Sequence, residues 1–245
     1  MGVITAEEKL EIKIKTHRQL MWIGVFSIVM MFAGLSSGYI VGKGDKTWVK
    51  IFVPDAFFVS TVILLFSSVT YFFAVRSIKD GKQKIALLMV GLTLILGVTF
   101  TAYQVKGWSY LTERNCNFGG GTSIRMVVEN DVAVYGKDYI VVQKGKELDY
   151  FEGKFYDPRD VNHSAPNTKV ALDASNNSSS FFFLMTGLHV FHLLFGLISL
   201  VLVFVKTIRK KYSIEDHIGI KVSAIYWHFL DFLWLYLLGL LYFVG

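Results

Sequence analysis

The chain has 245 residues, of which 53% are hydrophobic and 18% are charged, with three prolines and one cysteine. This composition is too apolar for an ordinary water-soluble domain and indicates an integral membrane protein. The formal net charge of +6 does not indicate nucleic-acid binding, because the lysines and arginines gather at the ends of apolar runs. Cys116 is alone, so it cannot form an internal disulfide, and the sequence has no Cys/His spacing typical of a zinc site.

Five apolar runs are long enough to cross a membrane as helices, since about 20 apolar residues span the hydrocarbon core. The runs cover about residues 19–41, 52–75, 85–106, 180–205 and 218–244. The first run is longer than the apolar part of a signal peptide, follows a charged head and lacks a small-residue cleavage site. We therefore expect five transmembrane helices in a single membrane domain over residues 1–245.

Basic residues are distributed unevenly between the two sides that such helices define. Twelve of them lie in the N-terminal head and in the second and fourth connections: Lys9, Lys13, Lys15, Arg18, Arg76, Lys79, Lys82, Lys84, Lys206, Arg209, Lys210 and Lys211. The first connection has Lys43, Lys46 and Lys50, and no basic residue follows the last run. By the positive-inside rule, we expect a cytoplasmic N-terminus and a C-terminus on the outer side.

The third connection, residues 107–179, is too long for a simple turn. In its middle, β-branched and aromatic residues alternate with charged ones, and turn signals occur at Glu129-Asn130-Asp131, Gly136-Lys137-Asp138 and Lys144-Gly145-Lys146. This pattern predicts strands and hairpins. The expected fold is an all-α membrane protein of five transmembrane helices, with a small β-rich insertion on the outer side that acts as a structural lid or as a docking module.

Ionisable side chains occur inside two of the apolar runs. His189 and His192 lie in the fourth run, and His228 and Asp231 lie in the fifth. At a rise of about 1.5 Å per residue, both pairs reach a similar depth near the midplane of the membrane. Because residues i and i+3 share a helix face, two antiparallel helices can set both histidines against His228 and Asp231.

Such a group of side chains fits three roles. Charges are costly at the centre of a bilayer, so the group can be a buried polar lock that aligns two helices. Imidazoles and a carboxylate can also hold zinc or iron, as a metal or haem site. The third role is a proton relay through the membrane. In the first two runs, the small residues of FAGLSSGYIV and VSTVILLFSSVT are typical of close helix packing.

The fourth and fifth runs also resemble a known family. The segment from Phe181 to Gly196, FFFLMTGLHVFHLLFG, and the segment from Tyr226 to Trp234, YWHFLDFLW, are similar to the last two helices of subunit III of haem-copper oxidases, the cytochrome c oxidase subunit III family. The segment FVSTVILLFSSVTYFFAV resembles the second helix of the five-helix bacterial form. The segment LGVTFTAYQVKGW, through Gly97, Phe100 and Gln104, resembles the third.

Two positions depart from the family pattern. Many members carry a glutamate after a serine in the first of these helices, where this chain has Ile28 after Ser27. Many also carry a carbodiimide-reactive glutamate three residues after the glutamine of the third helix, where this chain has Gly107. Roles assigned to either carboxylate therefore do not transfer. The insertion is longer than the usual loop and is a place where a respiratory supercomplex partner could bind.

The resemblance implies a non-catalytic subunit of a cytochrome c oxidase-type oxidoreductase and proton translocase in a bacterial inner membrane. Such a subunit supports oxygen reduction and proton pumping by subunit I through packing, bound phospholipid and stable proton uptake. Its partners are oxidase subunits I and II, which hold the haem and copper. The chain itself would have no catalytic residue, metal ligand or redox centre.

The resemblance also assigns roles to the polar residues. The expected structural polar cluster consists of His189, His192, His228 and Asp231. Residues expected at lipid or subunit contacts, or in ordinary packing, are Trp227, Trp234, Gln104 and Tyr226. The alternative function is a small membrane transporter or proton channel that uses the His/Asp cluster.

Overall fold

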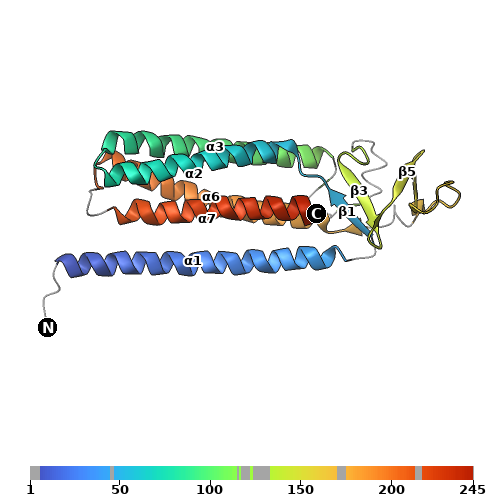
Figure 1. Ribbon diagram of the computed structural model, residues 1–245, viewed down its shortest axis with the longest axis horizontal. Coiled ribbons are helices and arrows are strands. Elements are labelled where there is room, and N and C mark those ends of the chain that lie inside the picture. Colours follow the sequence, from blue (N-terminus) through green and yellow to red (C-terminus); the bar gives the residue numbers. More distant parts are fainter. Residues whose placement is uncertain are drawn as a thin grey trace. The chain divides into compact units, whose positions relative to one another are not determined.

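The structure of the chain is a computed structural model that describes residues 6–44, 47–114, 116, 122–123, 133–169, 175–212 and 217–244. Its long helices are α1 (Ala6–Gly42), α2 (Asp55–Lys79), α3 (Gln83–Glu113), α6 (Ser178–Ile208) and α7 (Ile218–Gly239), and a π-helical segment η1 (Leu240–Val244) continues α7 (Figure 1). Five described helices are long and apolar enough to cross a membrane. This confirms the all-α membrane fold expected from the five apolar runs.

The ends of the helices follow from local sequence. Asp55 lies in the first turn of α2 and Arg76 and Lys79 in its last turn, so these charges complement the helix dipole. After α2 the backbone turns at Gly81, which has a φ of 73°. The amide of Lys82 donates to the carbonyl of Ser77 at 2.8 Å, and the amide of Gly81 donates to Ile78 at 3.0 Å. This pair of bonds is a Schellman cap, which satisfies the last carbonyls of the helix.

The chain groups into two compact units, and each unit contains parts of all five long helices. Unit 1 consists of Met1–Phe32, Val59–Ala102 and His189–Leu235, and unit 2 consists of Ala33–Phe58, Tyr103–Leu188 and Tyr236–Gly245. In unit 1 the helices pack closely at Gly97 of α3. A Cβ atom at this glycine would lie 2.7 Å from the ring of Trp227 and 2.9 Å from Leu197. Only the absence of a side chain at Gly97 permits this packing.

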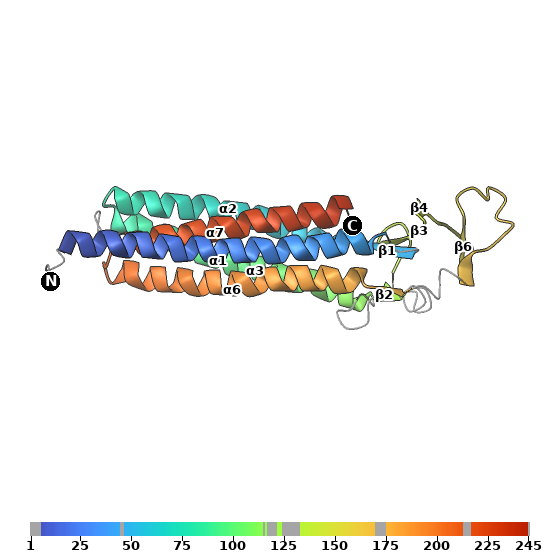
Figure 2. The same ribbon diagram turned by 90° about the horizontal axis from the view of Figure 1, so that it is seen from below.

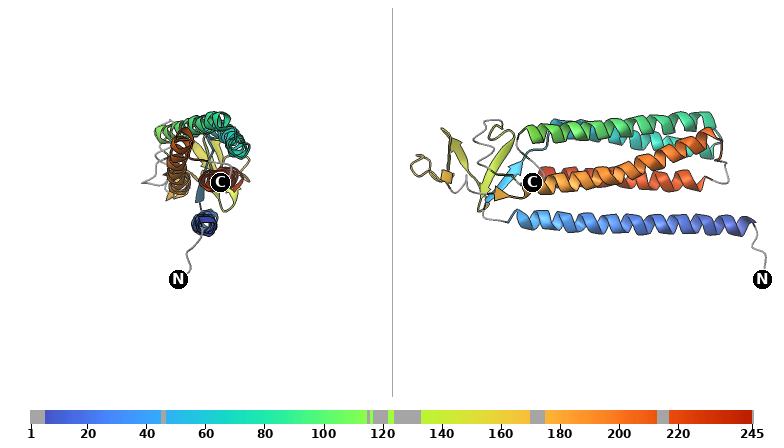
Figure 3. Two further views of the ribbon diagram at one scale, coloured as in Figure 1. Left: turned by 90° about the vertical axis from the view of Figure 1, so that its left-hand side faces the viewer. Right: turned by 180° about the vertical axis from the view of Figure 1, so that it is seen from behind.

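The strands of unit 2 form small antiparallel sheets. A three-stranded sheet has the order β1 (Thr47–Ile51), β3 (Tyr139–Gln143) and β4 (Lys146–Glu147), with Val49 opposite Val141. Two further pairs join β2 (Thr122–Ser123) to β7 (Ser175–Asn176) and β5 (Asp149–Phe151) to β6 (Lys154–Tyr156). Figures 2 and 3 show β1 beside β3. The β-rich insertion between α3 and α6 is thus confirmed, but its main sheet also uses β1 from the connection between α1 and α2.

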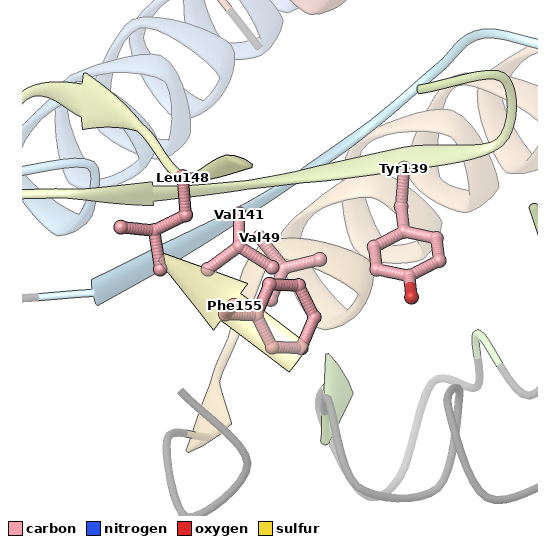
Figure 4. Packing of buried hydrophobic residues seen from close by; sticks show 5 residues of the cluster. All are labelled: Val49, Tyr139, Val141, Leu148 and Phe155. Carbon is pink, nitrogen blue, oxygen red and sulfur yellow. The ribbon is translucent and has the colours of Figure 1, made fainter. Parts of the chain in front are cut away.

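Turn residues and a small apolar core explain this sheet. Gly136 and Gly145 have positive φ angles of 80° and 76°, which glycine adopts without strain, and they lie in two of the expected turns. The third turn signal, at residues 129–131, falls outside the described residues. Buried side chains from β1, β3 and β6, and from the residue between β4 and β5, pack together in one cluster (Figure 4): Val49, Tyr139, Val141, Leu148 and Phe155.

Candidate functional site

His228 of α7 is the centre of the polar group in unit 1. Its Nδ1 atom lies 2.6 Å from the hydroxyl of Ser68 on α2 and 3.9 Å from Oδ2 of Asp231, one turn further along α7. The Asp231 side chain is only 6% exposed, whereas that of His228 is 37% exposed. One imidazole nitrogen therefore serves both neighbours. This differs from a catalytic Ser-His-Asp triad, in which the two ring nitrogens contact different partners.

Two tryptophans extend the contact between α7 and α2. Nε1 of Trp227 donates to the hydroxyl of Ser67 at 3.1 Å, and Nε1 of Trp234 donates to the hydroxyl of Thr61 at 2.8 Å. Both indole rings are buried within the chain, which favours packing over lipid contact for these residues. Together with the bond between Ser68 and His228, they form a row of polar contacts along two helices. In hydrocarbon, such bonds satisfy groups that would otherwise be left without partners.

The histidines of α6 lie against aromatic rings. The fully buried ring of His189 is 5.2 Å from Trp234 and 6.1 Å from Phe100, measured between ring centroids, and its two nitrogens have no hydrogen-bond partner among the described residues. The ring of His192 is 6.0 Å from Phe32 of α1. The carbonyl oxygen of His192 accepts a hydrogen bond of 3.1 Å from the hydroxyl of Tyr226. The two histidines thus link α6 to its neighbouring helices mainly through packing.

The structure brings together Ser68, His228 and Asp231, and it places His189 on the ring of Trp234. The sequence predicts a single cluster of His189, His192, His228 and Asp231, and this remains a prediction. The contacts of His189 among the described residues are with aromatic rings. Ser68 was not singled out as a site residue. Its signal was the Ser67-Ser68 pair in an apolar helix, which is equally typical of plain helix packing.

The described residues give no support to a metal site. No three His, Cys, Asp or Glu side chains in the described part of the chain gather so that they could hold a metal ion. The four candidate ligands, His189, His192, His228 and Asp231, are all described. Metal sites need several such ligands at short distances around one point.

Unit 2 contains a second polar group, which ties the end of α3 to the start of β3. The hydroxyl of Tyr110 donates to Asp138 at 2.8 Å, the amide of Val134 donates to it at 2.9 Å, and Nε of Arg114 lies 3.3 Å away. Burial acts to raise the pKa of Asp138, but these hydrogen bonds and the Arg114 charge outweigh it and lower the pKa below 3.8. Nearby, burial and the Asp138 charge raise the pKa of the Cys116 thiol to about 11.

Comparison with known proteins covers α7, which carries one side of this polar row, together with α6. The family model of cytochrome c oxidase subunit III matches residues 167–245, which include α6 and α7. The probable cytochrome c oxidase subunit 3 of Rickettsia bellii is 26% identical over 241 residues, covering 93% of this chain and 65% of the relative. The cytochrome c oxidase subunit 3 of Cyprinus carpio is 26% identical over 186 residues, covering 76% of this chain and 49% of the relative.

Over α6 and α7 the chain is similar to the cytochrome c oxidase subunit III family. Its similarity extends well beyond the matched helices, since the subunit 3 of Rickettsia conorii is also 25% identical over 93% of the chain. The chain spans less than two thirds of the length of the relatives described above, 65% for Rickettsia bellii and 64% for Rickettsia conorii.

The structure explains one departure from the family pattern. Gly107 stands where many members are expected to carry a glutamate, and Phe57 of α2 lies directly against it. A Cβ atom at Gly107 would be 2.7 Å from Cζ and 2.8 Å from Cε2 of Phe57. Gln104, one turn earlier in α3, is buried. The space of a larger side chain at 107 is therefore occupied by the Phe57 ring.

Proposed function

We propose that this chain is the non-catalytic subunit III of a haem-copper terminal oxidase of the cytochrome c oxidase type. The single observation that carries the proposal is the family match across α6 and α7, the helices whose polar side chains are used for internal contacts. In this role the chain assembles with subunits I and II, which hold the haem and copper. It supports oxygen reduction and proton pumping by subunit I without a redox centre of its own.

The polar row fits a bracing role. His228, Trp227 and Trp234 each connect α7 to a hydroxyl side chain of α2. Polar contacts of this kind fix the rotation of two helices about their axes, because a turned helix would leave the groups without partners in hydrocarbon. The face of the bundle offered to the other subunits is then held in one arrangement. Stable assembly, and through it sustained proton uptake, follows from that rigidity.

Exposed apolar side chains give the chain surfaces for its neighbours. On α6 they form a stripe at helical spacing: Phe191, Leu194, Phe195 and Ile198. In a membrane such a stripe is covered by lipid tails or by another helix. We assign these surfaces to the oxidase subunits and to bound phospholipid. The similarity to bacterial oxidase subunits supports a bacterial inner-membrane location, and the distribution of basic residues favours a cytoplasmic N-terminus and a periplasmic C-terminus.

The insertion offers a further surface for a respiratory supercomplex partner. Phe151 of β5 and Val161 are both exposed, and the ring of His163 stacks on Phe151 with 4.8 Å between centroids and an interplanar angle of 9°. Exposed aromatic residues of this kind are common in protein interfaces. A supercomplex partner would bind this surface on the complete oxidase. Such binding is separate from the assembly of the chain with subunits I and II.

Affinity purification from its own membranes tests the proposed function. A tag on this chain should co-purify protein that contains haem and copper, whereas the chain purified alone should contain neither. The visible spectrum and metal analysis of both samples make the comparison. The alternative, a small transporter or proton channel that uses the His/Asp cluster, predicts proton flux through liposomes that contain the isolated chain. Flux of that kind without any haem-containing partner would overturn the oxidase assignment.

A further inference from the structure

An exposed face of α7 in unit 1 carries one polar side chain among apolar ones. Four of its residues recur at spacings of three and four: Ile225, His228, Phe232 and Leu235. The three apolar residues are exposed, Phe232 to 71%, and the His228 side chain is 37% exposed. Residues at this spacing line one side of a helix, as the a and d positions of a coiled coil do. The pattern is therefore that of a helix-packing surface.

The surface continues onto α2 where the two helices touch. Ser68, whose hydroxyl lies 2.6 Å from Nδ1 of His228, has an exposed apolar residue one turn away on either side, Leu65 and Phe72. Residues three and four apart share a helix face, so these side chains flank the Ser68–His228 contact. We call the combined surface the α2–α7 seam: Leu65, Phe72, Ile225, His228, Phe232 and Leu235. Two adjacent helices with apolar ridges of this kind can receive a third helix.

Within the described residues, His228 uses one of its two imidazole nitrogens. Nδ1 lies near both Ser68 and Asp231, whereas Nε2 has no hydrogen-bond partner among the described residues. In either neutral tautomer, Nε2 remains a hydrogen-bond donor or acceptor. A polar atom without a partner is costly in hydrocarbon, so a purely apolar cover would leave this nitrogen unsatisfied. A hydroxyl suits both tautomers, because it can donate and accept.

Depth in the membrane restricts what can supply that hydroxyl. The membrane-crossing segment runs from Ile218 to Val244, so His228 lies ten residues after one end and sixteen before the other. At about 1.5 Å per residue, these separations are roughly 15 and 24 Å, in a hydrocarbon core of about 30 Å. Lipid headgroups lie at the ends of that core, and acyl chains carry no hydrogen-bonding group. A side chain of another membrane-spanning helix is therefore the group that reaches Nε2.

We propose that the α2–α7 seam is the docking surface for a membrane-spanning helix of a partner oxidase subunit, which offers a serine or threonine hydroxyl to Nε2 of His228. This inference rests on the proposed function, in which the chain assembles with other subunits. A single polar residue in an apolar packing face fixes the register of the helices that meet there. Nδ1 of His228 then joins α7 to α2, and Nε2 sets the depth of the partner.

Photo-crosslinking in the assembled complex tests the seam. The photoreactive residue p-benzoylphenylalanine replaces Phe232, one turn from His228, and the tagged full chain is irradiated in its own membranes and purified. We expect a crosslink to a membrane-spanning peptide from a subunit of the haem-containing complex, identified by mass spectrometry. The same probe in place of Ile95, which is exposed on α3, is the control. Crosslinks only to lipid or to a second copy of this chain, or the same peptide from both positions, would overturn the proposal.

Two substitutions of His228 separate the roles of its nitrogens. The amide of asparagine reaches the position of Nδ1, and the longer glutamine reaches that of Nε2. His228→Asn should keep the melting temperature of the isolated chain while lowering the haem retained per chain by about threefold to tenfold, the range for one hydrogen bond between membrane helices. His228→Gln should retain the haem but melt at a lower temperature, because the contact with Ser68 is lost.

The outcomes distinguish this inference from the proposed function. Wild-type chain that co-purifies no haem would contradict the proposed function before any variant is compared. If the wild type retains haem and His228→Asn retains as much, the seam proposal is overturned and the oxidase assignment stands. Losses of haem that follow the melting temperature in both variants would assign the effect to internal packing and would also overturn the seam proposal.

Discussion

The hydroxyl of Ser68 on α2 and Nδ1 of His228 on α7 lie 2.6 Å apart in the middle of unit 1. The same nitrogen is 3.9 Å from Oδ2 of Asp231, one turn further along α7. A serine that is usually taken as a small packing residue therefore connects α2 to the His228–Asp231 pair of α7.

Replacing Ser68 by alanine removes this link, and alanine itself favours a helix more than serine does. We expect Ser68→Ala to lower the free energy of unfolding by about 1 kcal/mol, because the partly buried imidazole of His228 loses its hydrogen-bond partner on α2. Ser109→Ala is the control, since that exposed hydroxyl bonds only to the Val105 carbonyl of its own helix, at 3.1 Å. Thermal unfolding in detergent measures both. Equal melting temperatures for the two variants would contradict a bracing role for Ser68.

Asp231 permits a test of bracing against proton transfer. Asp231→Leu should impair assembly of the chain with the haem-containing subunits, because His228 loses its carboxylate neighbour inside the membrane. The haem spectrum of the complex that does assemble should be unchanged. Co-purification yield and visible absorption are the measurements. Normal assembly combined with lost proton pumping would favour the relay instead.

Gly97 tests the close packing of α3 against α6 and α7. Gly97→Ala should destabilise the chain by about 1 to 3 kcal/mol, since the added carbon would overlap the buried Trp227 ring. Gly24→Ala is the matched control in unit 1: its added carbon meets no atom within 4 Å, and alanine favours a helix over glycine. A denaturant titration of both proteins should therefore show shifts of opposite sign.

Asp138 should make the insertion sensitive to acid. The pKa of Asp138 is lowered in the folded state, so its stabilising effect is complete above the unfolded value of about 3.9. That effect is lost as the pH falls through the lower folded value. Asp138→Asn should cost about 1 to 3 kcal/mol at pH 7 and remove this part of the acid sensitivity.

Hydrogen exchange of the β3 amides reports on Asp138 directly, because β3 begins at the next residue. Exchange in the Asp138→Asn variant should be faster at neutral pH and should change less than the wild type between pH 5 and pH 3. Asp149→Asn, at an exposed position of β5, should behave as the wild type. An acid response retained in full by Asp138→Asn would assign the sensitivity to other carboxyl groups.

Features that depend on local sequence were the ones that could be predicted. A run of about 20 apolar residues specifies a membrane helix by itself, and glycines such as Gly145 specify turns through their positive φ angles. Strand β1 was missed because its five residues gain a strand conformation only by pairing with β3, which follows two complete helices later. Pairing over such a separation leaves no local pattern.

In the candidate site, too, the features that depend on local sequence could be predicted, and those that depend on packing could not. Depth along a helix follows from counting residues, so the sequence predicts how far His189 and His228 lie along their helices. Rotation about the helix axis does not follow from counting. It depends on how the large rings of Phe100 and Trp234 pack, and these rings enclose His189. The partner of His228 was therefore a hydroxyl on α2, and the sequence could not distinguish it from the other small residues of that helix.

The Phe57 ring lies so close to Gly107 that substitutions at these two positions depend on each other. A glutamate at 107 would overlap that ring where it now lies. A chain of this lineage that gained the carboxylate before a smaller residue at position 57 would have to shift the Phe57 ring in a packed interior. Within the family, the two positions should therefore change as a pair, and a bulky aromatic residue at the start of the second helix should mark members that lack the carboxylate.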